Sequence, residues 1–456
     1  MKKIKAVILA AGKGTRMKSD LHKVLHKVYD RSIIDYVCNA CEDADASEIY
    51  IITGYKAEQV EAHIREKRQN VKFCLQKEQL GTGHAVMQAE KYIDDDDLVV
   101  VINGDQPLIS SQTIKSLVTF CDQGNYGGAV LSGIVDNPGS LGRVIRDNNG
   151  NLSKIVERKD CDEFEEKVKE VNIGVYCFNG KLLKASFSKL DDNNAQGEYY
   201  ITDIPAHIKR AGYNFGVYTM PDMSEFQGVN SREELSIATK TLLNKTRKMH
   251  MENGVTLIDP NNTYISLDAK IGRDTIIYPG TNIQGETIIG ENCVIGPNSN
   301  IISSTIGNNV TVEMSKIVES KISDNSLIGP FAHIRPNSNI DKNCKVGSFV
   351  ETKNVNIGTG TKVPHFIYTG DADIGNNVEI ACGAITANMN INWEKNRTVI
   401  KDNAFIGANS TLLAPVTIEE NAIVAAGSVI NKDVPQSALA IARERQTIKE
   451  NFNTKK

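Results

Sequence analysis

A glycine-rich segment near the N-terminus, LAAGKGTRM at residues 9–17, has the composition of a phosphate-binding loop. Its small residues allow backbone N–H groups to curl around phosphate oxygens, and Lys13, Arg16 and the nearby Lys23 carry positive charges that would neutralise them. The spacing matches neither a Walker loop nor a dinucleotide-binding fingerprint. A plain strand-to-helix turn is the alternative interpretation.

Two further polar segments could complete such a site. The stretch QKEQLGTGHA offers Gln76, whose amide can read a base edge, and Gly81 and Thr82, which would admit a planar base or a ribose. The stretch NGDQPL ends an apolar run in one carboxylate, Asp105, which suits a hard cation. Phosphoryl-type transfer needs such a metal together with basic side chains. We therefore expect nucleotide chemistry in the N-terminal half.

A different chemistry is indicated around His365, one of eight histidines in the chain. A reaction that removes a proton from an amine needs a base, and histidine suits that role near neutral pH. Arg335 and Lys353 fall on neighbouring sequence repeats, where stacking would bring both to one face as phosphate clamps. A histidine that only satisfies a polar contact is the alternative interpretation.

The N-terminal half alternates apolar runs with a helical pattern. Three runs have the length of buried strands: AVILA (6–10), EIYIITG (48–54) and DLVVVING (97–104). Between the first two, SIIDYVCNACEDA (32–44) has the spacing of a helix. This order predicts βαβ units and a mostly parallel sheet, whose ligands bind beyond the carboxyl ends of the strands. The glycine-rich loop and Asp105 both lie at such ends.

The C-terminal half repeats aliphatic residues with a period of six, in three runs. The periodic positions are Ile271, Ile277, Ile283, Ile289, Ile295 and Ile301, then Ile322, Ile328, Ile334, Ile340 and Val346, and then Ile400, Ile406, Leu412, Ile418, Val424 and Ile430. This period indicates a β-helix in which each hexapeptide forms one flat side of a triangular coil. A charged segment without Gly or Pro at 231–251 predicts a connecting helix, with Ser231 and Glu234 as a capping box.

Many short segments occur, in order, in one enzyme family. LAAGKGTRM, KVLH, QLGTGHA, GDQPL, NNAQGEYYITD and GVN resemble the pyrophosphorylase half of the bifunctional bacterial N-acetylglucosamine-1-phosphate uridyltransferase/glucosamine-1-phosphate acetyltransferases. IGPFAHIRP, VGSFVETKN, KVPHFIYTGDADIG and AIARERQ resemble the acetyltransferase half. The resemblance implies an α/β nucleotidyltransferase domain, Rossmann-like with a mostly parallel sheet (1–229), a linker helix (230–252), a left-handed parallel β-helix of hexapeptide repeats (253–439) and a C-terminal tail (440–456).

The resemblance also implies roles for residues of the N-terminal half. The residues expected to bind UTP or the UDP-sugar are Leu9, Ala10, Ala11, Gly12, Arg16, Lys23, Gln76, Gly81, Thr82, Gly142, Glu157, Asn172 and Asn230. Asp105 and Asn230 are expected to hold Mg²⁺. The family often has Tyr at Asn103 and an aromatic at Leu141, so we expect weaker packing around the nucleotide or the sugar, with no loss of charge.

In the C-terminal half, the resemblance implies that His365 is the general base. The residues expected to bind the acetyl acceptor are Arg335, Lys353, Tyr368, Glu379 and Asn388. Those expected to contact acetyl-coenzyme A are Cys382, Ala408, Ala426 and Arg443. The β-helix half resembles hexapeptide acyltransferases that form trimers, in which each site is shared between subunits. We therefore expect a homotrimer that is active only when assembled.

The segment IACGAITANMNINWEKN (380–396) interrupts the six-residue period. We expect it to leave the coil as a loop beside a neighbouring subunit's substrate, with Asn388 in its family position. Glu379 and Met389 stand where the family has Asn and Tyr, and Asn-Ile replaces the usual Asp-Gly. The charge of Glu379 would lie beside the substrate phosphate or pair with the substrate ammonium. We therefore expect the base and the phosphate clamps to survive, with acceptor affinity or choice altered.

The resemblance implies synthesis of UDP-N-acetylglucosamine from acetyl-coenzyme A, glucosamine-1-phosphate and UTP. Acetyl transfer to glucosamine-1-phosphate would precede uridylyl transfer to N-acetylglucosamine-1-phosphate, with release of pyrophosphate. One alternative is a uridylyltransferase whose β-helix serves trimer assembly and carries a weakened or altered acetyltransferase site; another is a non-enzymatic nucleotide-sensing trimer. Lys23, Asp105 and Asn230 argue against the last, and His365 with its cationic neighbours favours the bifunctional enzyme.

Bulk properties narrow the partners and the location. A net charge of −4 gives no electrostatic case for nucleic acid, and the lack of an apolar run of about 18 residues predicts no membrane span. The short apolar run after the basic N-terminus leads directly into Gly-Lys-Gly, so we expect no signal peptide. Nine scattered cysteines indicate reduced thiols in a cytoplasm.

Overall fold

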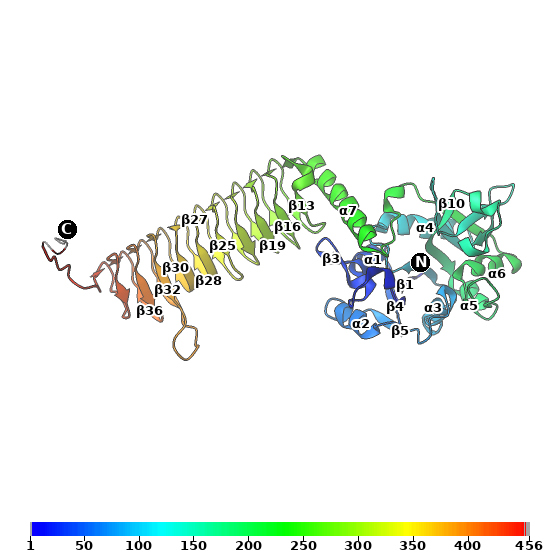
Figure 1. Ribbon diagram of the computed structural model, residues 1–456, viewed down its shortest axis with the longest axis horizontal. Coiled ribbons are helices and arrows are strands. Elements are labelled where there is room, and N and C mark those ends of the chain that lie inside the picture. Colours follow the sequence, from blue (N-terminus) through cyan, green and yellow to red (C-terminus); the bar gives the residue numbers. More distant parts are fainter. Residues whose placement is uncertain (1, 451, 453–456) are drawn as a thin grey trace. The chain divides into compact units, whose positions relative to one another are not determined.

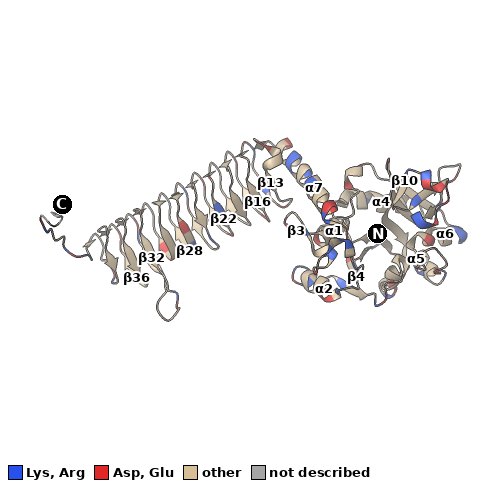
Figure 2. Cartoon of the chain, in the orientation of Figure 1, with Lys and Arg blue, Asp and Glu red and all other residues tan. Residues whose placement is uncertain are grey.

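The computed structural model describes residues 2–450 and residue 452. The chain divides into two compact units, Met1–Leu242 and Leu243–Lys456, and the division falls within helix α7 (Arg232–Glu252) (Figure 1). Figure 2 shows charged residues along the helices of the first unit and along α7, and fewer on the strands of the second unit. The two units therefore differ in construction.

The first unit is built on a nine-stranded mixed sheet in the order β11-β7-β10-β6-β1-β4-β5, with β8 paired to β10 and to β9. The strands are β1 (Ile4–Leu9), β4 (Glu48–Thr53), β5 (Lys72–Leu75), β6 (Leu98–Asn103), β7 (Gly128–Ile134), β8 (Arg143–Arg146), β9 (Leu152–Val156), β10 (Glu170–Asn179) and β11 (Phe215–Thr219), besides the small hairpin β2 (Lys27–Val28) and β3 (Arg31–Ser32). β1 pairs in parallel with β4 and β6, whereas β10 is antiparallel to β6 and β7. The three predicted strands are confirmed as β1, β4 and β6.

Helices cover both faces of this sheet. They are α1 (Ile33–Asp43), α2 (Ala57–Arg65), α3 (Thr82–Met87), α4 (Ser111–Gln123), α5 (Gly180–Phe187) and α6 (Ile204–Arg210). Alternate residues of β1 point to opposite faces: Ala6 and Ile8 belong to the core beneath α1 and α4, and Val7 to the core beneath α3, α5 and α6. The predicted helix over 32–44 is confirmed as α1, with Ser32 as its N-cap.

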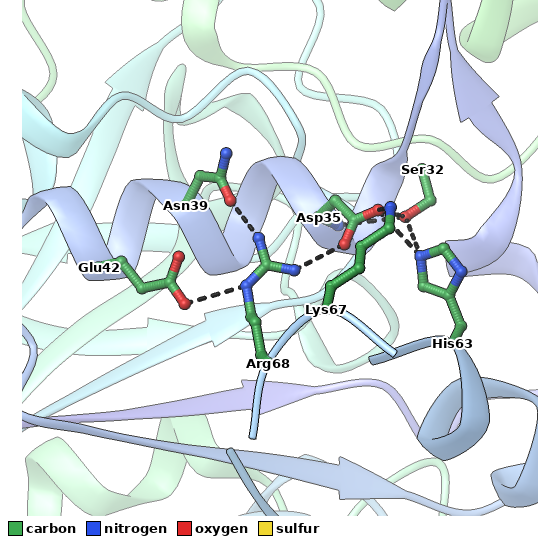
Figure 3. A network of polar contacts seen from close by, with 7 residues as sticks. All are labelled: Ser32, Asp35, Asn39, Glu42, His63, Lys67 and Arg68. Atoms are coloured by element: carbon green, nitrogen blue, oxygen red, sulfur yellow. Dashed lines mark hydrogen bonds and ion pairs between the residues drawn. The ribbon is translucent and has the colours of Figure 1, made fainter. Parts of the chain in front are cut away.

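A polar network joins α1 to the end of α2 (Figure 3). Asp35 is 1% exposed, and it accepts hydrogen bonds of 2.7 Å from Lys67 Nζ and from Arg68 Nη1. The Ser32 hydroxyl donates to the same carboxylate over 2.7 Å, and His63 Nε2 lies 2.9 Å from it. Burial alone would raise the pKa of Asp35, but these partners hold it well below its usual value.

The predicted connecting helix is confirmed as α7, and so is its capping box. The Glu234 N–H donates to Ser231 Oγ over 3.2 Å, and the Ser231 N–H donates to Glu234 Oε2 over 3.1 Å. Leu242 in α7 packs in the first unit, whereas Arg247 Nη1 donates to the carbonyl of Thr263 in the second unit over 3.3 Å. Among the helices described, none is long and apolar enough to cross a membrane.

The second unit is a parallel β-helix of short strands, and this prediction is confirmed. Successive coils pair in register, as at Ile277 and Ile295. The periodic aliphatic residues form one buried core, with Ile271 partly buried at its margin. The period slips after Ile301 because the next coil is shorter: Ile301 pairs with Ile317, sixteen rather than eighteen residues on.

The candidate residues of this unit lie on two of its sheets. The strands concerned are β25 (His333–Ile334), β27 (Lys345–Ser348), β28 (Glu351–Ile357), β29 (Lys362–His365), β30 (Tyr368–Ile374), β31 (Glu379–Ile380), β32 (Ile385–Ala387) and β33 (Thr398–Ile400). β25, β28, β30, β32 and β33 belong to one sheet, and β27, β29 and β31 to the other. Register along each sheet therefore decides which side chains share a face.

Between β32 and β33, residues 388–397 leave the coil as a loop, drawn in orange in Figure 1. Met389 and Lys395 form an antiparallel bridge at its base, and the exposed tip carries Ile391 and Trp393, which are 95% and 83% exposed. The predicted interruption of the six-residue period is therefore a hydrogen-bonded loop, as expected.

Candidate functional site

The residues predicted to bind a nucleotide meet at the carboxyl ends of β1 and β6. A cavity of about 250 Å³ is lined there by Leu9, Ala10, Ala11, Gly12, Lys23, Gln76, Gly81, Thr82 and Asp105. A second cavity of about 460 Å³ shares Leu9, Thr82 and Asp105 with the first, and its lining also includes Arg16, Gly142, Glu157, Asn172 and Asn230. The two cavities together are lined by every residue that the family resemblance assigned to the nucleotide, the sugar and the metal. Lys13, which was also expected to neutralise phosphates, is exposed and lines neither cavity.

The backbone explains why two of these loops need glycine. Gly14 has a φ of +57°, and a Cβ there would lie 2.6 Å from the Cβ of Lys23. Gly81 has a φ of +112°, and a Cβ there would lie 2.6 Å from the carbonyl oxygen of Tyr199. The Gly83 N–H donates to that same carbonyl over 2.7 Å. The segments QLGTGHA and GEYYITD, distant in sequence, are thus joined through their backbones.

Three residues from distant segments converge where the two cavities adjoin. Lys23 Nζ donates to Asp105 Oδ2 over 2.6 Å and to Asn230 Oδ1 over 2.9 Å. A carboxylate and an amide oxygen are hard donors, and they fit Mg²⁺ when waters and phosphate oxygens complete its shell. Among the residues described, no group of three or more His, Cys, Asp or Glu could hold a metal alone. The donor set therefore suits a metal that arrives with phosphates.

The second cavity contains the residues predicted for the sugar. Burial raises the pKa of Glu157, and the Thr202 hydroxyl donates to Glu157 Oε1 over 3.2 Å. The Asn172 N–H donates to the carbonyl of Gly142 over 2.9 Å, and Asn172 Nδ2 donates to the Tyr176 hydroxyl over 2.6 Å. The cavity therefore presents fixed hydrogen-bonding groups of the kind that orient a sugar.

The two departures from the family pattern lie in these cavities. Asn103 lines both of them, and Leu141 lines the second while packing against the core beneath α1 and α4. The positions are those expected, and their effect on ligand packing stays a prediction.

Sequence reasoning missed His22, Gln79 and Glu198, which also line the first cavity. His22 is 1% exposed, and its Nδ1 accepts a hydrogen bond of 3.4 Å from the Val24 N–H. Burial, with the charge of Lys23 beside it, lowers the pKa of His22 to about 4, so the ring is neutral at pH 7. One signal for His22 was present in the sequence, its position next to Lys23. The burial that lowers its pKa cannot be read from the sequence.

The phosphate clamps predicted for the β-helix stack on one face. Ile334 pairs with Thr352, so Arg335 and Lys353, each one residue further on, lie side by side. Lys353 lies in turn beside β30, the strand that begins with Tyr368. Register alone thus brings three of the five predicted acceptor residues together.

The loop adds a third cation that sequence reasoning did not include. The positive charges of Lys395 and Arg335 lower the pKa of Lys353, so three basic side chains share this region. Asn388, at the start of the loop, donates from its amide to Asp371. Lys395 was missed because the loop departs from the family pattern. Such a cluster favours an anion such as phosphate.

His365 lies around a corner from these cations. It ends β29 and is exposed, Phe366 follows at the corner with a φ of 53°, and Tyr368 opens the next face as the first residue of β30. One chain therefore carries the predicted base and the predicted clamps on adjacent faces.

The residues predicted for acetyl-coenzyme A follow the same corner through later coils. The carbonyl of Phe366 accepts a hydrogen bond of 3.0 Å from the following coil, and those of Cys382 and Ala408 accept bonds of 2.8 Å. The carbonyl of Ala426 accepts a bond of 3.0 Å from Arg443 Nη1. The predicted coenzyme residues thus stack on successive coils along the edge where His365 lies, and we call this stack the coenzyme column.

Glu379 lies on β31, in the sheet that carries His365, and its carboxylate is 3.8 Å from Lys362 Nζ. The sequence suggested a charge beside the substrate phosphate or the substrate ammonium. Lys353 belongs to the other sheet, and Arg335 follows β25 of that sheet, so the structure gives no reason to expect Glu379 beside the clamps of its own chain.

Comparisons with known proteins cover both units. The family model described as Nucleotidyl transferase matches residues 5–224, and the model described as Bacterial transferase hexapeptide (six repeats) matches residues 268–303, 319–354 and 397–432. The chain is 46% identical to the Bifunctional protein GlmU of Clostridioides difficile (strain 630), over 99% of this chain and 98% of that protein. It is 47% identical to the protein of the same name from Alkaliphilus oremlandii (strain OhILAs), over 100% and 99%. Likeness of this extent shows that the chain belongs to the GlmU family of bifunctional proteins.

Proposed function

We propose that the chain makes UDP-N-acetylglucosamine in two steps, one in each unit. The β-helix unit transfers an acetyl group from acetyl-coenzyme A to glucosamine-1-phosphate. The first unit then transfers a uridylyl group from UTP to N-acetylglucosamine-1-phosphate. The observation that carries the proposal is the meeting of all the expected nucleotide, sugar and metal residues around two adjoining cavities. The alternative without acetyl transfer is not favoured, because His365, the cation cluster and the coenzyme column are all present in the second unit.

Uridylyl transfer needs no nucleophile from the protein. A phosphate oxygen of the sugar phosphate attacks the α-phosphorus of UTP, the new P–O bond forms, and the bond to the β-phosphate oxygen breaks to release pyrophosphate. Gln76 and the backbone around Gly81 orient the base, while Lys23 and Arg16 neutralise the phosphates. Asp105 and Asn230 would hold Mg²⁺, which when bound would add further neutralisation of the phosphates.

Acetyl transfer needs a base and a fixed amine. The amine nitrogen of glucosamine-1-phosphate attacks the thioester carbonyl carbon, a C–N bond forms, and the C–S bond breaks to leave the coenzyme thiol. His365 takes the proton that the amine loses and passes it to the departing thiolate. Arg335, Lys353 and Lys395 hold the phosphate through charge, and Tyr368 borders the same face. The coenzyme lies along the column that ends at Arg443.

We propose further that the chain works as a homotrimer in the cytoplasm. His365 and the cation cluster occupy adjacent faces of a convex β-helix, so a second copy is needed to enclose a substrate between them. The exposed tip of the loop offers Ile391 and Trp393 for such a contact. The exposed phenylalanine stack at Phe331, Phe349 and Phe366, with ring centroids 5.1 and 5.0 Å apart, offers another.

Assays of both half-reactions on the wild type, Asp105→Ala and His365→Ala test the proposal. We expect Asp105→Ala to lose UDP-sugar formation by about a thousandfold and to keep acetyl transfer. We expect His365→Ala to lose acetyl transfer by about a hundredfold or more and to keep uridylyl transfer. Intact uridylyl transfer in the first variant would contradict the metal assignment, and intact acetyl transfer in the second would contradict the base. A wild type without acetyl transfer would contradict the bifunctional assignment.

A further inference from the structure

Strand β30 carries a buried carboxylate beneath the start of the loop. Asp371 is 7% exposed and has a φ of 48°, so its backbone turns a corner of the coil. Its Oδ1 accepts a hydrogen bond of 2.5 Å from Asn354 Nδ2, and its Oδ2 accepts one from Asn388 Nδ2. Both carboxylate oxygens are therefore used by amide donors from the neighbouring coils.

The charge of Asp371 is placed among the cations of the acceptor site. Burial alone would raise its pKa, but the hydrogen bonds from Asn354 and Asn388 and the charges of Lys395 and Lys353 lower it below its usual value. Lys353 in turn has its pKa lowered by Lys395 and Arg335, and the negative charge of Asp371 opposes that effect. Asp371 therefore stays ionised at neutral pH and offsets repulsion within the cluster.

The hydrogen bond to Asp371 also decides how Asn388 faces the site. Because Nδ2 is committed to the carboxylate, the amide carbonyl of Asn388 is left as an acceptor in a fixed orientation. The backbone carbonyl of Asn388 accepts from the Asn396 N–H over 2.8 Å, which closes the base of the loop. At the other end, Arg397 binds both oxygens of Asp373, at 2.5 Å to Oδ2 and 2.6 Å to Oδ1. Both ends of the loop are thus attached to carboxylates of β30.

The choice of Asp at this corner is informative. Several other corners with positive φ hold Asn, as at Asn337, Asn343 and Asn354. Asn would satisfy the backbone equally well. Its side chain would nevertheless present one N–H₂ donor to two amide donors, so one of Asn354 and Asn388 would lose its acceptor. The backbone at 371 therefore does not require a carboxylate. The amides of Asn354 and Asn388 and the neighbouring lysines are the groups that a carboxylate satisfies.

We propose that Asp371 is a positioning residue of the acetyl-transfer site, acting through the side-chain amide of Asn388 and the cations beside it. The inference rests on the proposed acetyl transfer to glucosamine-1-phosphate. Asp371 orients the Asn388 carbonyl toward the acceptor and keeps the loop that bears Lys395 over the phosphate clamps. The carboxylate itself does not contact the reacting atoms.

Steady-state kinetics of Asp371→Asn test this role. We expect the KM for glucosamine-1-phosphate to rise about tenfold, because a hydrogen bond to a charged group is lost near the acceptor. We expect uridylyl transfer, measured on the same preparation, to be unchanged. Asp341→Asn is the matched control: Asp341 is a β-helix carboxylate bonded to the Thr359 hydroxyl at 2.7 Å, and its replacement should leave that KM unchanged.

A double-mutant cycle with Asn388→Ala separates positioning from a general structural effect. If Asp371 acts through Asn388, the effect of Asp371→Asn on KM shrinks in the Asn388→Ala background. Additive effects, or an unchanged KM in Asp371→Asn, would overturn the proposal. Should Asp371→Asn not fold, Asn388→Ala alone decides, since an unchanged KM there would equally overturn it. Absence of acetyl transfer in the wild type would instead overturn the proposed function.

Discussion

The two candidate sites of this chain are made in opposite ways. In the first unit, loops after parallel strands surround adjoining cavities, and Lys23 and Asn230 meet at 2.9 Å although they are far apart in sequence. In the second unit, the candidate residues lie on the outside of a β-helix, in columns that follow strand register. His365 and the cations face different sides of one corner there.

The difference follows from the geometry of the two folds. Loops at one edge of a sheet can fold over a ligand, so one chain suffices to enclose it. The outside of a β-helix is convex, so residues on it cannot surround a ligand by themselves. They enclose a ligand only when a second surface packs against them. The comparison predicts that uridylyl transfer belongs to the single chain and acetyl transfer to the assembly.

Mixing inactive chains gives the largest expected effect. His365→Ala and Lys353→Ala should each lose nearly all acetyl transfer, whereas co-assembled chains in equal amounts should recover about a quarter of it. A shared site needs an intact His365 from one chain and an intact Lys353 from another. Each residue is intact in half of the chains, so about a quarter of the sites are complete. Co-expression with differently tagged chains and an acetyl-transfer assay measure this recovery.

The matched control uses the first unit. Mixing Lys23→Ala with Glu157→Ala chains should recover no uridylyl transfer, because both residues line cavities of one chain. Recovery in this control, or its absence in the β-helix mixture, would break the comparison.

The loop tip gives the next largest effect. Replacing Ile391 and Trp393 together by Asp should weaken assembly about a hundredfold, because burial of the two apolar side chains contributes about 3 kcal/mol in all. Sedimentation and acetyl transfer at low protein concentration should fall together, while uridylyl transfer persists. Phe164→Asp, a change at an 81% exposed residue of the first unit, is the control and should leave assembly intact. A stable trimer in the double variant would show that the tip is not a contact.

A smaller effect is expected at Lys395. Lys395→Ala should raise the KM for glucosamine-1-phosphate about tenfold, with little change in the KM for acetyl-coenzyme A, because one of three cations around the phosphate is lost. Lys401→Ala, at an exposed lysine of the same unit, should change neither value. Equal changes in the two variants would mean that Lys395 acts only through general charge.

The smallest effect on activity is expected at Asp35, in a network whose residues belong to neither candidate site. Asp35→Asn should lower the free energy of unfolding of the first unit by about 3 kcal/mol at pH 7, because the buried side chain would no longer carry the charge that pairs with Lys67 and with the partly buried Arg68. The pKa of Asp35 is depressed in the folded state, so its contribution is present above the unfolded pKa of about 4 and fades as the pH falls below it. Urea unfolding at pH 7 and at acidic pH measures this.

In that experiment, Asp43→Asn, at an exposed carboxylate of the same helix, should change stability little at either pH. Acetyl transfer at 25 °C should be unaffected by both variants. A loss of acetyl transfer in Asp35→Asn would show that the two units are coupled more closely than their separate cores imply.

Much of the architecture was predictable because it is periodic or local. The six-residue repeat identified the β-helix, since only one face of each hexapeptide can reach the core. Ser231 and Glu234 identified the start of α7, because a capping box is made within four residues. Three features were not predictable, because each depends on segments brought together by folding. They are the position of Lys395, the burial of His22 and the hydrogen bonds that Asp371 accepts.

The sequence by itself determined the family, the two kinds of chemistry and the residues expected to perform them, because motif wording and repeat period are written along the chain. The tertiary structure alone decided which residues share a face: Arg335 and Lys353 beside each other, His365 around the corner, and Glu379 beside Lys362. The physical reason is that backbone pairing between successive coils sets the register, and register sets the direction of every side chain. Coils of sixteen, seventeen and eighteen residues all keep this pairing, so spacing along the chain alone does not give the face on which a residue lies.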